Sequence, residues 1–237
     1  MPLYLPPATS GGNTTSSTTY GSEPGSPTTG DLDLYSNGLS LARYGGSAWP
    51  TWGPIWPLTP PPAVSNWTWV NQSTATATDT AGVIALQVPS NGGGWNVRYL
   101  RRAQTAGAWT LEAAYTMLAI NDSNAAAGIG CADSTGTKFI FFHVRNHAYC
   151  VSQMNSVSSV NGDAYVSTIY SYTPYLWFRI ADDGTTNRTY SISANGITWH
   201  QIYSETRTTF LTADSLLAGL NGFGSIADMT LLHWKVS

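Results

Sequence analysis

From about residue 67 to the carboxyl end, short apolar runs alternate with clusters of Gly, Asn, Asp and Ser. Runs in which every second residue is apolar are typical of strands that bury one face. The pattern predicts strands at residues 83–88, 95–102, 109–119, 126–132, 138–145, 148–153, 164–170, 175–181, 188–194, 198–203, 216–223 and 229–236. Apart from a short helical turn expected around residues 212–217, no segment has a helical period. We therefore expect an all-β domain built as a β-sandwich.

A second, shorter alternation surrounds the dipeptide Asn37-Gly38, with Leu32 and Leu34 before it and Leu39 and Leu41 after it. Asn-Gly accepts positive φ at both central positions of a tight turn, so this segment predicts a small β-hairpin. Two strands alone are marginally stable in water. We therefore expect the apolar face of the hairpin to contact another surface.

The segments around the hairpin suggest three parts. Residues 1–29 are rich in Pro, Gly, Ser and Thr and predict an extended arm or linker, because they cannot offset the entropy of ordering an independent domain. Residues 30–62 hold the hairpin and a connector in which prolines keep the backbone extended while Trp49, Trp52 and Trp56 project from it. These tryptophans pack either on the following domain of the same chain or between protomers. Residues 63–237 form the sandwich.

Composition narrows the function. Only 10% of the 237 residues are charged, whereas there are 10 Trp and 13 Tyr, which suits a β-rich protein with extensive chain-to-chain contacts. The net charge of -3 argues against nucleic acid as a partner, and no apolar run approaches the ~20 residues of a membrane span, so we expect no membrane insertion. The chain begins without a signal-peptide pattern, which favours synthesis in a cytosol. We expect Cys131 and Cys150 to be free, buried thiols.

The sequence does not predict an enzyme. Glycoside hydrolysis needs two carboxylates roughly 5 to 10 Å apart, and the only glutamates are Glu23, Glu112 and Glu205. Glu112 lies in a predicted strand whose same-face neighbours are Thr110 and Ala114, so the catalytic pair is missing. No nucleophile motif, phosphate-binding loop or Cys-x-x-Cys appears, and we expect no cofactor.

Two groups of residues raise the question of a metal. His143 and His147 combine with Asp163 only across a predicted turn, and structural roles fit them better. The turn Asp182-Asp183-Gly184 has calcium-ligand chemistry, but an Asp-Gly turn between strands needs no ion. We expect no metal site.

Aromatic and cationic side chains suggest a binding face. In the strand expected at 95–102, Trp95, Val97, Tyr99 and Arg101 alternate onto one face, with Arg98 and Arg102 on the other. A similar face joins Phe139, Phe141, His143 and Arg145. An aromatic plate beside guanidinium groups suits the apolar face of a sugar and its acidic substituents. The predicted ligand contacts are Trp95, Arg98, Tyr99, Arg101, His143 and Arg145. The alternative is that the aromatics are core and the arginines line a protein interface.

The last third carries a family resemblance. The run Leu176-Trp177-Phe178-Arg179-Ile180 is followed by a turn, by Tyr190-Ser191-Ile192-Ser193, by the turn Ala194-Asn195-Gly196, by a strand with Trp199, and by a closing strand through Trp234. This succession resembles the concanavalin A-like lectin and glucanase jelly roll over residues 67–237. The resemblance implies that fold, which hosts lectins, hydrolases and structural modules alike.

The hairpin region carries a second resemblance. Gly30-Asp31-Leu32, the Asn-Gly turn and Gly46-Ser47-Ala48-Trp49 resemble hairpin modules of bacteriophage fibres and other virion appendages. The resemblance implies a virion protein made in the host cytoplasm, a homotrimer, and contact with other virion proteins through Leu32, Leu34, Trp49, Trp52 and Trp56. The expected function is a non-enzymatic fibre that displays a lectin-like domain for adhesion to host-surface glycan. The alternatives are a capsid or tail decoration protein that binds only virion proteins, and a stand-alone carbohydrate-binding lectin module.

Overall fold

A computed structural model of the chain describes the side chains of residues 58–80, 82–104, 106–118, 124–168 and 176–237, and the backbone of four short strands before residue 58. The chain divides into two compact units, Met1–Pro57 and Leu58–Ser237.

The first unit contains a four-stranded sheet in the order β1-β2-β3-β4. Its strands are β1 (Thr15–Thr18), β2 (Leu32–Tyr35), β3 (Leu41–Arg43) and β4 (Thr51–Trp52). β2 and β3 pair antiparallel, with Leu34 opposite Leu41, which confirms the hairpin. β1 pairs parallel to β2, so the predicted arm contributes a strand of its own. The contacts predicted for Leu32, Leu34, Trp49, Trp52 and Trp56 lie outside the described side chains.

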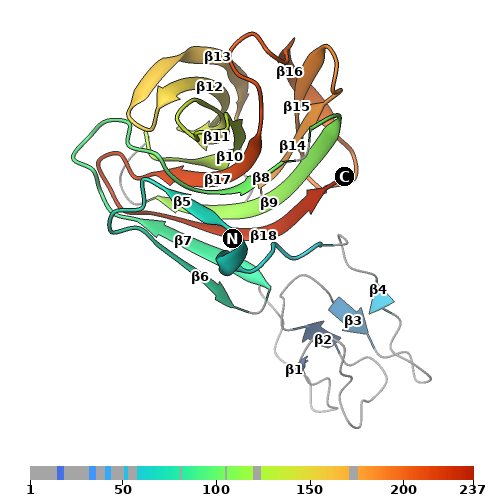
Figure 1. Ribbon diagram of the computed structural model, residues 1–237. Coiled ribbons are helices and arrows are strands. Elements are labelled where there is room, and N and C mark those ends of the chain that lie inside the picture. The colour runs from blue at the N-terminus through green and yellow to red at the C-terminus, as the bar shows by residue number, and fades with distance from the viewer. Residues whose placement is uncertain are drawn as a thin grey trace. The chain divides into compact units, whose positions relative to one another are not determined.

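The second unit is a sandwich of two antiparallel seven-stranded sheets. We call the first the rolled sheet, because its strands β10 to β13 curl around on themselves (Figure 1). Its order is β13-β12-β11-β10-β17-β8-β5. The strands are β5 (Thr68–Val70), β8 (Arg98–Ala103), β10 (Ala126–Ala132), β11 (Phe139–Arg145), β12 (Ala148–Ser156), β13 (Ser159–Tyr170) and β17 (Ser215–Asn221).

We call the second sheet the open sheet, and its order is β16-β15-β14-β9-β18-β7-β6. The strands are β6 (Thr76–Thr80), β7 (Val83–Val88), β9 (Trp109–Ala119), β14 (Leu176–Asp182), β15 (Asn187–Ser193), β16 (His200–Thr206) and β18 (Ala227–Val236). A single turn of 3-10 helix, η1 (Val64–Asn66), precedes β5. The fold is therefore the predicted all-β, concanavalin A-like jelly roll. No helix in the described part is long and apolar enough to cross a membrane.

The rolled sheet separates two apolar cores. The larger core fills the space between the two sheets, where Phe142 of β11 packs edge-on against Phe178 of β14 with ring centroids 4.3 Å apart. The smaller core lies on the opposite face of the rolled sheet and includes Tyr99, Phe139 and Phe141. Both faces of β11 are therefore buried, which explains the unbroken apolar run over its first four residues, Phe-Ile-Phe-Phe.

Two glycines of β10 permit the close approach of β10 and β11. Gly128 lies opposite His143, and Gly130 lies opposite Phe141. A Cβ atom at either glycine would come within 2.1 Å of the carbonyl oxygen of Phe142 or 2.0 Å of that of Ile140. No side chain fits at these two positions unless the strands separate.

Some local predictions need correction. The helical turn expected at 212–217 is absent, because residues 215–217 already belong to β17, which is buried along its whole length. Trp95 and Val97 precede β8 rather than forming its start. The prediction also missed β5 and β6. Cys131 and Cys150 are free and buried, as expected.

Candidate functional site

Three of the predicted ligand residues meet on the face of the rolled sheet that carries the smaller core. The His143 ring lies 5.6 Å from the Trp95 ring, centroid to centroid, in an edge-to-face arrangement. The guanidinium carbon of Arg145 lies 5.4 Å from the centre of the same indole. Phe141 stacks on His143, with ring centroids 4.7 Å apart. Trp95 is only half-buried. We call Trp95, His143, Arg145, Ser152 and Asp163 the Trp95 cluster.

Ser152 and Asp163, which the ligand prediction did not include, complete the cluster through a chain of hydrogen bonds. Ser152 Oγ lies 2.8 Å from His143 Nε2 and donates to Asp163 Oδ1 at 2.5 Å. Arg145 Nη2 donates to Asp163 Oδ2 at 2.9 Å. The chain therefore runs from a buried imidazole through a buried hydroxyl to an ion pair at the surface.

The hydrogen bonds place a proton on Nε2 of His143. A hydroxyl has one hydrogen, so Ser152 Oγ, which donates to Asp163, accepts from His143 Nε2–H. Nδ1 is buried without a hydrogen-bond partner, which disfavours a second proton there. Burial, together with the charge of Arg145, lowers the pKa of His143 from its usual 6.5 to about 3. His143 is a neutral support and not a proton-transfer group.

The outer end of the chain is charged and accessible. Burial opposes ionisation of Asp163, but hydrogen bonds from Ser152 and Arg145 outweigh it and hold the pKa of this carboxyl below its usual 3.8. The side chains of Arg145 and Asp163 are 22% and 26% exposed. An ionised carboxylate and a guanidinium are thus available to a ligand beside the Trp95 indole.

A β-bulge places Asp163 on this face. Val151 of β12 pairs with Tyr165 and the next residue, Ser152, pairs with Asp163, so Ala164 is an extra residue in β13. Ala164 and Tyr165 both pack against the core between the sheets. In a regular ladder Asp163 would share the face of Tyr165 and point into that core. The bulge turns the carboxylate toward Ser152 instead.

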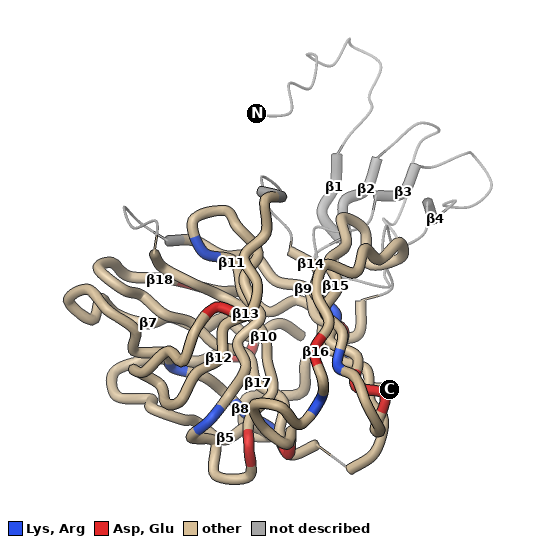
Figure 2. The backbone as a smooth tube through the Cα atoms, turned by 90° about the horizontal axis from the view of Figure 1, so that it is seen from above, with Lys and Arg blue, Asp and Glu red and all other residues tan. Residues whose placement is uncertain are grey.

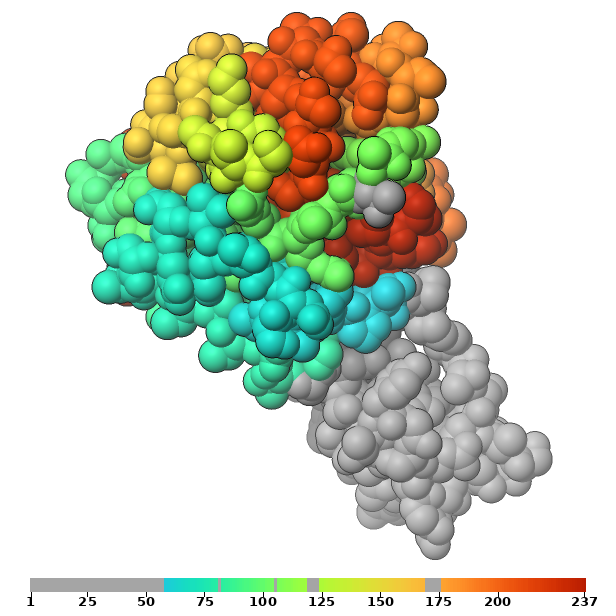
Figure 3. Space-filling model, in the orientation of Figure 1, coloured from blue at the N-terminus to red at the C-terminus, as the bar shows by residue number. Residues whose placement is uncertain are grey.

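Trp95 follows three glycines and is held by buried amides. Gly92, Gly93 and Gly94 all have positive φ, which few other residues adopt. Asn221, which is fully buried, accepts from Asn96 N–H at 3.0 Å and from Asn91 Nδ2 at 3.1 Å. Asn221 therefore holds both ends of the loop that presents Trp95. Just beyond this loop, Val97 N–H donates to the Val157 carbonyl, and in Figure 3 the green surface of this region lies beside the yellow surface of β12 and β13.

The other predicted ligand residues lie elsewhere. Tyr99 is fully buried in the smaller core and donates its hydroxyl to the Gly136 carbonyl. Arg101 donates to the Ser134 carbonyl at 3.1 Å, next to the same turn. Arg98 points to the opposite face, where it is 5% exposed and donates to the Pro89 carbonyl. Because Tyr99, Arg98 and His143 are buried, direct ligand contact by these three was a wrong prediction.

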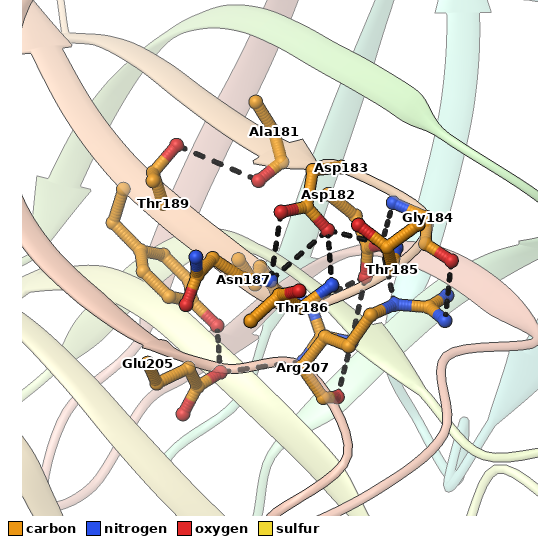
Figure 4. Close-up of polar contacts among 12 residues, drawn as sticks. Ala181, Asp182, Asp183, Gly184, Thr185, Thr186, Asn187, Thr189, Glu205 and Arg207 are labelled. Atoms are coloured by element: carbon orange, nitrogen blue, oxygen red, sulfur yellow. Dashed lines mark hydrogen bonds and ion pairs between the residues drawn. The ribbon is translucent and has the colours of Figure 1, made fainter.

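The Asp182-Asp183-Gly184 turn is occupied by protein groups (Figure 4). Asp183 Oδ1 accepts from the backbone N–H groups of Thr185, Thr186 and Asn187 at 2.6 to 3.0 Å. The carboxylate of Asp182 accepts from Arg188 and Arg207. A cation would have to displace donors that already neutralise these oxygens. No group of three potential metal ligands occurs among the described residues, and this holds for His143, His147 and Asp163 too.

The turn belongs to a buried charged network. Arg188, 1% exposed, bridges Asp182 Oδ2 at 3.1 Å and Glu205 Oε1 at 3.3 Å. Tyr190 donates to Glu205 Oε1 at 2.6 Å, and Arg207 closes the network with a 2.7 Å bond to Asp182 Oδ1. Two carboxylates face two guanidinium groups, so the charges balance.

Glu112 lies on the outer face of the open sheet. Arg179 donates to it from Nε at 3.0 Å and from Nη2 at 2.5 Å, and Lys235 is 3.9 Å away. Arg179 also stacks on Trp199, 4.0 Å from the ring centre. Charged residues are sparse along the rest of the described backbone (Figure 2). Glu112 is a sheet residue held in an ion pair.

No family model and no curated protein matches the chain. A functionally unknown protein from Saccharomyces cerevisiae is similar, with a TM-score of 0.56 over 74% of this chain and 98% of that one, at 14% identity. The carbohydrate-binding module CBM66 from Bacillus subtilis has a TM-score of 0.50 over 73% of this chain and 95% of its own, also at 14% identity. Both likenesses show the fold.

Proposed function

We propose that the jelly roll binds a carbohydrate at the Trp95 cluster without cleaving it. The observation that carries the proposal is a half-buried indole beside an ionised Arg145–Asp163 pair that is partly open to solvent. The indole offers a flat apolar surface to the C–H face of a sugar ring. The guanidinium donates to sugar hydroxyls, and the carboxylate accepts from them.

The buried part of the cluster supports binding by holding these groups in place. Ser152 holds Asp163 by a hydrogen bond from the buried side and is itself held by His143. Asn221 holds the loop that carries Trp95. A preorganised site loses less side-chain entropy when a ligand binds. The fold likeness to CBM66, which its name describes as a carbohydrate-binding module, is consistent with this function.

The chemistry of the cluster argues against hydrolysis. Retaining and inverting glycosidases both need two carboxyl groups, one of which stays protonated to act as the acid. The Trp95 cluster contains one carboxyl, Asp163, and its pKa is lowered, so it is ionised at neutral pH. Glu112 and Glu205 are held in ion pairs on other parts of the open sheet.

The test is a glycan panel probed with the full chain, followed by calorimetry on the sugars that bind. Trp95→Ala is expected to weaken binding about 30-fold, as for a contact worth roughly 2 kcal/mol. Trp199→Ala is the matched control, because Trp199 lies on the outer face of the open sheet. Equal loss in both variants, or release of reducing ends from a bound glycan, would contradict the proposal.

We further propose that the first unit joins the jelly roll to a larger assembly, as the resemblance to virion appendages implies. The supporting observation is a sheet whose strands are only two to four residues long. Such short strands gain little stability unless another surface covers them. The proposed setting is a trimeric phage fibre that displays the glycan-binding domain, and a decoration protein that binds only virion proteins is the alternative.

Sedimentation of the full chain at tens of micromolar tests this assembly, with a trimer as the expected state. A monomer at that concentration would end the fibre interpretation. Gold labelling of source particles with an antibody to the jelly roll then distinguishes tail from head, and unlabelled particles would exclude a virion location.

A further inference from the structure

We infer that the Trp95 cluster selects neutral saccharides and rejects those that carry a carboxylate. The inference rests on the proposed carbohydrate binding and names the class of ligand. It follows from the charge of the cluster. Arg145 and Asp163 are the charged groups that act on the buried His143, and their charges cancel.

The cation of the cluster is already paired. Arg145 Nη2 donates to Asp163 Oδ2 at 2.9 Å, which is the length of a charge-assisted hydrogen bond. A ligand carboxylate that accepts from the same guanidinium would lie beside the Asp163 carboxylate. Like charges at that separation repel, and water screens the repulsion only in part because both side chains are about three-quarters buried.

The carboxylate of Asp163 remains ionised when a ligand binds. Ser152 and Arg145 stabilise the ionised form of Asp163, so the carboxyl does not accommodate an acidic sugar by taking up a proton near neutral pH. Ser152 is itself held by His143 from behind, which prevents the carboxylate from turning away.

A neutral sugar satisfies the same groups without repulsion. Each carboxylate oxygen of Asp163 has a second lone pair, and Arg145 has further N–H groups besides the one that it gives to Asp163. Adjacent hydroxyls donate to the carboxylate and accept from the guanidinium at the same time. The indole of Trp95 then covers the apolar face of the ring.

The experiment compares sugars that differ only at C6. Neutral oligosaccharides that bind the full chain are paired with the corresponding uronates and with the uronate methyl esters. Wild-type protein is expected to bind the neutral form at least about tenfold more tightly than the uronate, the size of a modest repulsive contribution to specificity. The methyl ester, which is uncharged, is expected to bind nearly as well as the neutral sugar.

Asp163→Asn tests whether the negative charge of Asp163 causes the preference for neutral sugars. Asparagine keeps an oxygen for Ser152 but removes the negative charge and leaves Arg145 free for a ligand, so the preference is expected to shift toward the uronate. Asp228→Asn, on β18 of the open sheet, makes the same change of charge and is expected to leave the preference unchanged.

The outcomes separate two failures. Tighter binding of uronates by the wild-type chain, or an ester that binds no better than its acid, overturns the inference while carbohydrate binding stands. Absence of binding to every glycan overturns the proposed function itself. If Asp163→Asn does not fold, the wild-type comparison of acid with ester still decides the question.

Discussion

Two clusters of arginine and carboxylate in the same jelly roll differ most in their access to water. The Arg188 network on the open sheet is sealed, with the Arg188 side chain 1% exposed and the Asp182 side chain fully buried. The Arg145–Asp163 pair on the rolled sheet is partly open. Both have an aromatic neighbour, Tyr190 in the first and Trp95 in the second.

The difference shows how the same side chains serve different purposes. In the sealed network all three nitrogens of the Arg188 guanidinium donate to groups of the chain itself, so this buried cation is not available to a ligand. A buried pair also carries a large desolvation penalty, which makes the loss of one partner costly. In the open pair the penalty is smaller, and unused hydrogen-bonding capacity faces solvent. We therefore expect the first cluster to govern stability and the second to govern binding.

The largest expected loss of stability comes from removing Arg188 from the sealed network. Arg188→Met leaves Glu205 buried without its cation and removes one partner of Asp182. We expect the free energy of unfolding to fall by about 3–5 kcal/mol, measured by urea denaturation of the full chain. A loss below about 1 kcal/mol would show that the network is not a stabilising unit and would end the comparison.

A smaller loss of stability, which depends on pH, is expected from the neutral imidazole of His143. Its pKa is about 3 in the folded chain and 6.5 when unfolded, so only the unfolded chain takes up a proton between these values. Stability from His143 is therefore full above pH 6.5 and is lost as the pH falls toward 3, at about 1.4 kcal/mol per pH unit.

The His143→Gln variant measures this contribution. Glutamine does not titrate, so the variant is expected to lose about 2 kcal/mol less than wild type when the pH is lowered from 7 to 5. Urea denaturation at both pH values provides the comparison. Parallel losses in the two proteins would show that His143 becomes protonated in the folded chain.

Replacing the buried amide of Asn221, which holds the Trp95 loop, is expected to affect both stability and glycan binding. Asn221→Ala removes the acceptor for Asn96 N–H and for Asn91 Nδ2. We expect stability to fall by about 1 kcal/mol and glycan affinity to fall about threefold to tenfold, because the Trp95 loop loses its fixed geometry. If affinity does not change while stability falls, Asn221 supports the fold and not the site.

The smallest change in stability is expected at the open pair. Arg145→Gln should lower the free energy of unfolding by no more than about 1 kcal/mol, since the pair is partly screened by water. The same variant should lose most of its affinity for glycan. A stability loss comparable to that of Arg188→Met would remove the distinction between the two clusters.

The sequence predicted several strands well, because their burial follows a simple period, although β13 begins at Ser159 and not at residue 164 as predicted. β7, β9 and β10 have the predicted bounds, and Phe139, Phe141, His143 and Arg145 do share a face. Prediction from alternating apolar residues failed for strands that are polar or very short. β6 reads Thr-Ala-Thr-Asp-Thr and lies at the edge of its sheet, and β5 has three residues. Neither carries an apolar stripe that could be recognised.

The candidate site was half predictable. Trp95, His143 and Arg145 were chosen because aromatic and cationic residues alternate there, and they do meet. Asp163 could not be assigned to the same face, since its position depends on the extra residue Ala164 and alternation from Tyr165 points it into the core. The burial of Tyr99 also depends on tertiary packing, because the curl of the rolled sheet covers a face that would otherwise meet solvent.

The two glycines of β10 have a genetic consequence. Every single-nucleotide change that replaces glycine introduces a side chain or a stop signal, and at Gly128 and Gly130 the Cβ atom alone already collides with the backbone of β11. Strand β11 carries His143 and Arg145 directly across from this point or just beyond it. A saturation mutagenesis map scored for folded protein should therefore show Gly128 and Gly130 among its most intolerant codons.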